Sequence, residues 1–88
     1  EGYVKQMEEK LRDIEHEVRS DNSVSIYRTA HAIKSMSANI GAEKVRSLSA
    51  AIESKGRDND IADLSESVVG LTQAYQEFLV EFSTTYTR

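Results

Sequence analysis

The stretch TAHAIKSMSANIGAE (Thr29–Glu43) contains both a helical pattern and the point where it ends. Ala30, Ile33 and Ile40 recur at helical spacing, and Gly41 follows them directly. Glycine just past a helix commonly takes the left-handed conformation, because it has no Cβ to clash. The chain is therefore expected to turn at Gly41 and begin a second helix there, instead of continuing as one long rod.

The same periodicity extends outward from this turn to both ends of the chain. Apolar residues recur at alternating steps of three and four, which is the signature of an amphipathic helix. The pattern predicts helices at about residues 2–19, 23–40, 42–55 and 60–83. Asn22 or Ser23 is a candidate N-cap for the second helix, and Gly56 is expected to close the third. Asn59 or Asp60 is expected to cap the fourth.

Four amphipathic helices joined by short loops predict an all-α fold. We expect an antiparallel up-down-up-down four-helix bundle, formed as a single domain by residues 1–88. Leu71 and Phe78 lie on the unbroken apolar stripe of the fourth helix and are expected in its core. A continuous coiled coil is the alternative, because the stripes also read as heptads. The polar and glycine breaks near residues 21, 41 and 57 favour the bundle.

Composition and charge exclude several classes of protein. The chain has no cysteine, which excludes disulfides and thiolate metal sites. No apolar run approaches the ~18 residues of a membrane span, so no membrane contact is expected. The net charge is −4, yet residues 23–52 carry a local excess of +3. This density is too low to predict nucleic-acid binding and fits a small anionic group or an acidic protein surface. A chance fluctuation of a few charges is the other interpretation.

His31 is the candidate reactive residue. At about 100° per residue it projects away from the apolar stripe of its helix and faces outward. The residues that share this face are Tyr27, Arg28, Ser35 and Ala38. Lys34 lies to one side, one turn further along. Imidazole is a workable nucleophile near neutral pH, a nearby lysine can neutralise phosphate oxygens, and small neighbours let a second protein approach.

The second histidine serves as a comparison. His16 lies between Glu15 and Glu17, away from the apolar stripe of the first helix, and we interpret it as an ordinary surface residue. The two histidines lie on different predicted helices without converging carboxylates. A metal site is therefore not expected.

The segment AHAIKSMSANIGAEKV resembles the signature of histidine-containing phosphotransfer (HPt) domains, A-H-x-L-K-G-x-x-x-x-x-G-A. The residues in register with it are Ala30, His31, Ile33, Lys34, Gly41 and Ala42. Further along, Val45, Leu48 and Ile52 fall where the family has apolar residues, and Glu53 falls where it has Glu. The resemblance covers about residues 25–56, and the first and fourth helices agree in pattern and length.

The resemblance assigns roles to these residues. His31 is similar to the phospho-accepting histidine, which is modified on Nε2, and Lys34 is similar to the lysine beside the phosphate. Ser35 replaces the usual glycine and could hydrogen-bond the phosphate. Gly41 matches the hairpin glycine. The expected partner-binding residues are Tyr27, Arg28, Ala38, Lys44 and Arg46.

Such domains resemble carriers between receiver domains, not kinases. The resemblance implies that response-regulator receiver domains are the partners and that any Mg²⁺ comes from the receiver, so this chain needs no cofactor. It implies no ATP-dependent kinase activity of the chain's own, and the sequence has no glycine-rich nucleotide loop. We expect a monomer in the cytoplasm. A hybrid sensor histidine kinase, with an inner-membrane anchor outside this segment, is the hypothesis for the parent chain.

Two other functions fit a helical domain with an exposed histidine. The first is the dimerisation and phosphoacceptor domain of a sensor kinase, which typically has an acidic residue directly after the histidine and a proline soon afterwards. Here Ala32 follows His31, and the chain has no proline. The second is a helical interaction module without chemistry, in which His31 is incidental.

Overall fold

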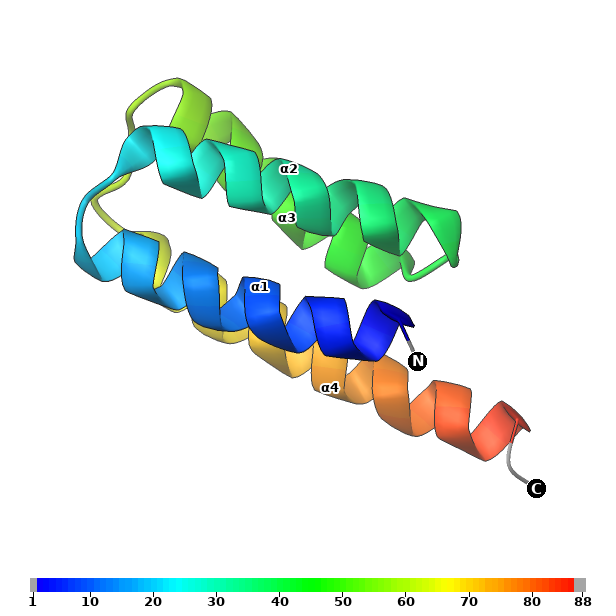
Figure 1. Cartoon of the computed structure of the whole chain (residues 1–88). Coiled ribbons are helices and arrows are strands. Elements are labelled where there is room, and N and C mark those ends of the chain that lie inside the picture. Colours follow the sequence, from blue (N-terminus) through cyan, green and yellow to red (C-terminus); the bar gives the residue numbers. More distant parts are fainter. Residues whose placement is uncertain (1, 87–88) are drawn as a thin grey trace.

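The computed structural model describes residues 2–86, with the side chains placed through residue 82. Four helices follow one another along the chain: α1 (Gly2–Arg19), α2 (Ser23–Asn39), α3 (Glu43–Arg57) and α4 (Leu64–Tyr86). Consecutive helices run antiparallel, so the α1–α2 turn and the α3–α4 loop lie at one end of the bundle (Figure 1). The α2–α3 turn lies at the other end, with both termini. The up-down-up-down bundle expected from the sequence is confirmed.

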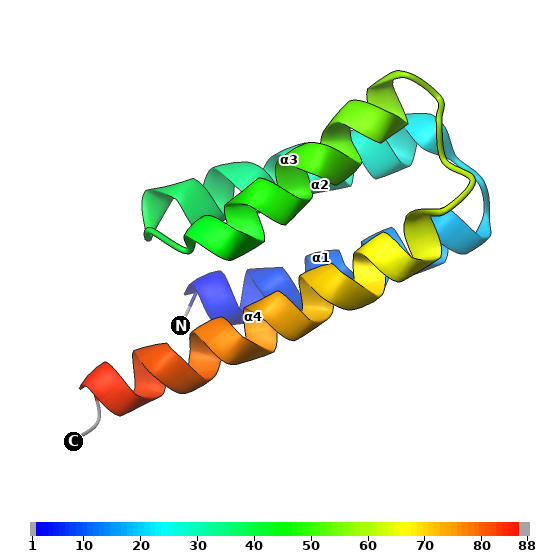
Figure 2. The same cartoon turned by 180° about the vertical axis from the view of Figure 1, so that it is seen from behind.

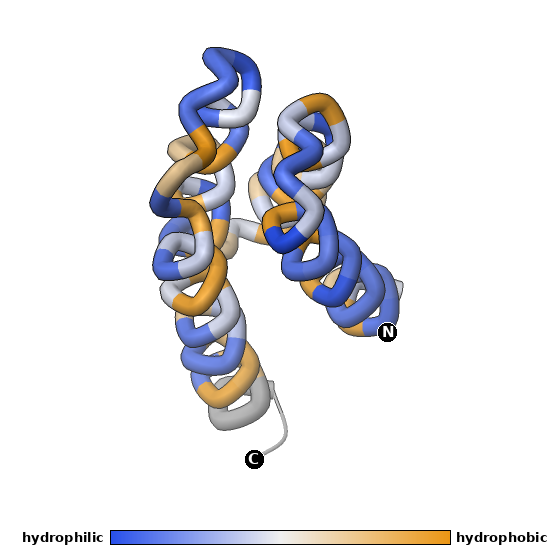
Figure 3. The backbone as a smooth tube through the Cα atoms, turned by 90° about the vertical axis from the view of Figure 1, so that its left-hand side faces the viewer, coloured by the Kyte–Doolittle hydropathy of each residue, from blue (hydrophilic) through white to orange (hydrophobic). Residues whose placement is uncertain are grey.

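Each helix packs against two others in a closed ring. α2 contacts α1 and α3, and α4 completes the ring by contacting α3 and α1. The view from behind shows α2 and α3 as one antiparallel pair and α1 and α4 as the other (Figure 2). Apolar and polar residues alternate along all four helices, as expected of amphipathic helices that bury one face (Figure 3). A single rod-like coiled coil is excluded.

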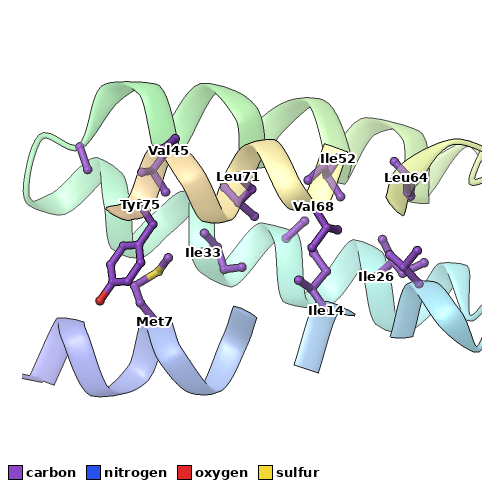
Figure 4. Packing of buried hydrophobic residues seen from close by; sticks show 14 residues of the cluster. Met7, Ile14, Ile26, Ile33, Val45, Ile52, Leu64, Val68, Leu71 and Tyr75 are labelled. Atoms are coloured by element: carbon purple, nitrogen blue, oxygen red, sulfur yellow. The ribbon is translucent and has the colours of Figure 1, made fainter. Parts of the chain in front are cut away.

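The core runs along the axis of the bundle and receives side chains from all four helices. Met7, Ile33 and Leu71 are fully buried there, with Tyr75 beside them (Figure 4). Phe78, which was expected in the core with Leu71, is only half-buried and packs against the edge of this cluster. Ile40, directly after α2, and Phe82, near the end of α4, remain 42% and 47% exposed.

Three short reversals join the helices, and each contains one residue in the left-handed conformation. These residues are Asp21, Gly41 and Asn59, with φ of 54°, 76° and 57°. Each reversal has the pair of backbone hydrogen bonds that defines a Schellman motif, such as Ala42 N–H to Ser37 O at 2.9 Å. Gly41 therefore has the turn conformation that its position after α2 predicted. Asn22 is the N-cap of α2, and its Oδ1 accepts from Ser25 N–H at 3.1 Å.

The predicted boundary between the third and fourth helices was wrong. α3 continues through Gly56 to Arg57, and Asn59 takes the left-handed position instead of glycine. Asp60 N–H then bonds Lys55 O at 2.8 Å, so Asn59 and Asp60 end α3 and do not cap α4. The chain needs further residues to reverse direction, and α4 begins at Leu64 instead of residue 60.

Gly56 is instead a point of close contact between α2 and α3. It is buried, and a Cβ added there would lie 3.0 Å from Tyr27 N and 3.2 Å from Tyr27 Cα. A glycine at this position lets the two backbones approach more closely than any larger residue would. This contact lies one helical turn from the functional site described next.

Candidate functional site

His31 lies on the outer face of α2, near the middle of the helix. Its side chain is 55% exposed, because Ile26 and Ile33 turn the opposite face of α2 into the core. Ser35 and Ala38 lie one and two turns further along the same outer face and are also exposed. The structure therefore places an accessible imidazole beside small side chains, in an open part of the surface.

A buried carboxylate from α3 holds one edge of the imidazole. Glu53 Oε2 lies 2.8 Å from His31 Nδ1, and the Glu53 side chain is only 7% exposed. The other carboxylate oxygen, Oε1, lies 2.6 Å from Lys34 Nζ. Glu53 thus joins the histidine and the lysine of α2 through its two oxygens. A buried carboxylate is stable only when it is paired and hydrogen-bonded, as it is here.

These contacts determine the ionisation of Glu53. Burial by itself would raise the pKa of the Glu53 carboxyl, but the hydrogen bonds that it accepts from Lys34 and His31, together with the positive charge of Lys34, outweigh this effect. The pKa of Glu53 is therefore lowered, and the carboxylate is the form present near neutral pH. A carboxylate only accepts hydrogen bonds, so the proton shared with His31 belongs to Nδ1.

This arrangement selects one ring nitrogen for chemistry. With the proton on Nδ1, the lone pair of the neutral imidazole is on Nε2, at the opposite edge of the ring from Glu53. Lys34 offsets the charge of Glu53, which would otherwise repel an incoming anion. The site offers an oriented, exposed nucleophile with a cation beside it.

The sequence model of the Hpt domain family matches residues 1–81. The chain belongs to the Hpt domain family. Comparison with curated proteins and with solved structures gave no match. Membership gives the chain a histidine phosphotransfer role in phosphorelays, and Hpt domains interact with receiver domains. The family match extends the resemblance seen in residues 25–56 to α1 and most of α4.

The structure gathers some of the expected Hpt partner-binding residues around His31 and separates others. Tyr27 and Lys34 lie on the α3 side of His31, whereas Arg28 and Ser35 lie on its other side, as 100° per residue requires. Arg46 is seven residues before Glu53 on α3 and so shares its face. The Nε atom of Arg46 lies 3.0 Å from Glu43 Oε1.

Lys44 is the expected partner-binding residue that lies apart from His31. Nine residues before Glu53, it projects from the opposite side of α3, and its Nζ is 3.3 Å from Glu77 Oε1 of α4. The positive excess counted in residues 23–52 is thus divided between two faces. It is also partly offset by carboxylates, although exposed pairs of this kind contribute little to stability.

Glu53 is the site residue whose role sequence reasoning missed. Its position was matched to a Glu of the family, but no contact with His31 was expected. A signal was present, because Glu53 follows Ile52 and falls within the apolar stripe of its helix. A carboxylate in such a place requires partners, and in the structure both of its partners come from α2.

Three further observations concern the described part of the chain. Within residues 2–86, no group of three or more His, Cys, Asp or Glu side chains is arranged to hold a metal ion. His16 is exposed on α1, away from the site. In this same part of the chain, no helix combines the length and the apolar character needed to cross a membrane.

Proposed function

We propose that His31 accepts a phosphoryl group on Nε2 from the aspartyl phosphate of a receiver domain and passes it to the aspartate of another. The observation that carries this proposal is the hydrogen bond between His31 Nδ1 and the buried Glu53 carboxylate. It keeps the proton on Nδ1 and leaves the Nε2 lone pair free at an exposed edge. His16 has no such partner among the described side chains.

The transfer is a displacement at phosphorus. Nε2 attacks, the N–P bond forms while the P–O bond of the acyl phosphate breaks, and the electron pair of that bond returns to the receiver's aspartate carboxylate. Nδ1 keeps its proton throughout, so the phosphorylated imidazole is cationic and faces the Glu53 carboxylate. Phosphoryl transfer depends mostly on such positioning and charge stabilisation. We expect Lys34, and Ser35 on the other side, to contact phosphate oxygens, and Mg²⁺ would come from the receiver's acidic pocket.

The receiver would dock on the outer face of α2 and the adjoining face of α3. Arg28 and Arg46 supply positive charge there for an acidic phosphorylation pocket. Such charges mainly accelerate encounter, so transfer should slow as the salt concentration rises. Ala38 would lie under the partner, because a small side chain permits close approach. The chain is expected to act as a monomer, which a scattering or sedimentation mass would test.

The deciding experiment is transfer from a labelled receiver. A receiver domain carrying a labelled aspartyl phosphate is mixed with the chain, and acid-labile, base-stable label is measured. His31→Gln should take up no label, while His16→Gln should label normally. Glutamine retains an N–H that can donate to Glu53, so the variant should melt within a few degrees of the parent. Label on His31→Gln would refute the assignment.

A second pair of variants tests the docking face. Ala38→Trp should block transfer by steric exclusion and leave the helical signal unchanged. Ala51→Trp is the matched control, because Ala51 is also exposed but projects from α3 about 160° away from Glu53. Equal transfer by both variants would contradict the docking model.

Lys34→Ala should lower transfer without abolishing it.

A further inference from the structure

An aromatic ring lies beside the His31 imidazole and is roughly parallel to it. Tyr27 lies one turn earlier on α2, and its ring is stacked on that of His31, with the centroids 6.4 Å apart and the planes 25° from parallel. Residues four apart on a helix are surface neighbours, which permits this contact. Tyr27 is half-buried, whereas His31 is exposed. The imidazole therefore has a nearly parallel aromatic neighbour in addition to the carboxylate on its edge.

The position of Tyr27 is determined by α3. The Tyr27 backbone lies against Gly56, where an added Cβ would be 3.0 Å from Tyr27 N. Glu53, which holds His31 Nδ1, is three residues before Gly56 on the same helix. One stretch of α3 thus fixes both neighbours of the imidazole, the carboxylate directly and the phenol ring through its backbone.

We propose that Tyr27 is a positioning residue for His31 that also stabilises the phosphorylated imidazole. This inference rests on the function proposed above. In the neutral form of the free His31 ring, which is the nucleophilic form, the single proton is on Nδ1. Once Nε2 carries a phosphoryl group and Nδ1 keeps its proton, the ring is cationic. The face of an aromatic ring attracts a cation, so the contact with Tyr27 is stronger in the phosphorylated state than in the free one.

Two consequences follow for the phosphorylated chain. The stacked ring restricts rotation of the imidazole and keeps Nε2 directed outward toward a partner. It also lowers the free energy of the phosphorylated state, and this stabilisation fades as the N–P bond breaks and the ring loses its charge. Loss of the phosphoryl group to water should therefore be slower with Tyr27 than without an aromatic ring at this position.

This role differs from the docking contact expected for Tyr27 from the sequence. A docking residue affects transfer only when a receiver is present. A residue that stabilises the phosphorylated imidazole affects the lifetime of the isolated phosphoprotein. The test therefore uses the chain alone, phosphorylated chemically with phosphoramidate, in a His16→Gln background that leaves His31 as the only histidine.

The rate of label loss is followed by ³¹P NMR for the parent, Tyr27→Phe and Tyr27→Leu. We expect Tyr27→Leu to lose its phosphoryl group about twofold faster than the parent, which corresponds to the lower end of exposed cation–π strengths, because the 6.4 Å between centroids is at the outer limit of such contacts. Tyr27→Phe, which keeps the ring, should match the parent. Tyr27→Met provides a second non-aromatic variant if leucine disturbs the fold, and far-UV circular dichroism checks that each variant is helical.

Equal lifetimes in the parent and both non-aromatic variants would overturn the proposal, as would a phenylalanine variant as short-lived as the leucine one. The imidazole proton shifts give an independent readout, since ring-current displacement should persist in Tyr27→Phe and vanish in Tyr27→Leu. Chemical loading does not involve a receiver. Failure of receiver transfer would therefore refute the proposed function without altering these lifetimes, and the two failures can be told apart.

Discussion

Alanine substitutions at two helical glycines should change the stability of this domain in opposite directions. Gly70 lies within α4, and a Cβ built there has no neighbour within 4 Å. Alanine in a helix interior is favoured over glycine by up to about 1 kcal/mol, because glycine loses more backbone entropy on folding. For a domain of this size, Gly70→Ala should therefore raise the melting temperature by roughly 4–8 °C.

Gly56→Ala should lower the melting temperature instead. The added methyl carbon would lie 3.0 Å from Tyr27 N and 3.2 Å from Tyr27 Cα, and these backbone atoms cannot move aside by changing a rotamer. The two helices must separate by a few tenths of an ångström. Overpacking of this kind typically costs about 1–3 kcal/mol, more than the gain from helix propensity. A net fall of several degrees is expected.

The same displacement should reach the functional site. Glu53 lies one turn from Gly56, so moving α3 outward should lengthen its 2.8 Å contact with His31 Nδ1. Thermal unfolding by circular dichroism gives the stability, and two-dimensional NMR gives the shifts of Tyr27 and His31. Gly70→Ala controls for helix propensity alone. The reasoning fails if Gly56→Ala stabilises the domain as much as Gly70→Ala and leaves these resonances in place.

Three further predictions concern the core and the ionisable groups. Leu71→Ala should lower the free energy of unfolding in urea by about 2–5 kcal/mol, because Leu71 is fully buried. Phe78→Ala should lower it clearly less, because Phe78 is only half-buried. Equal losses of free energy for the two variants would contradict this prediction. The pKa of Glu53 is lower in the folded state than its value of 4.5 in the unfolded state, so ionised Glu53 stabilises the fold. This contribution is fully present above pH 4.5 and should be lost as the pH falls below 4.5 through the folded pKa. In urea titrations, the free energy of unfolding should fall less on acidification for Glu53→Gln than for the parent. Burial raises the pKa of Tyr75 from 10.0 to about 12, so stability should decline as the pH rises between these values, and Tyr75→Phe should decline less.

Helix content was largely predictable because it depends on local pattern. The apolar spacing in each segment defines which face turns inward, and it correctly predicted that Leu71 is buried and His31 exposed. The end of the third helix was predicted wrongly because two candidate residues competed for one local role. Gly56 and Asn59 can both take a left-handed position, and only the packing of α3 against α2 decides that Gly56 stays helical.

The environment of His31 illustrates the same division. The sequence alone predicted the outward histidine and a lysine three residues later on the same helix. It did not predict that Lys34 pairs with Glu53, because the two residues lie on different helices. Nor did it separate Lys44 from the face that carries His31, which requires knowing which side of α3 meets α4.

Local sequence patterns suffice to specify the four amphipathic helices, the turn at Gly41 and the exposed imidazole on α2. These features follow from backbone conformation and from burial of apolar residues within one or two helical turns. The packing of α3 against α2 is needed to bring a carboxylate 22 residues away to Nδ1 of that imidazole. The register of α3 against α2 depends on the close contact at Gly56, and such a register is a property of two packed surfaces, which no single helix contains.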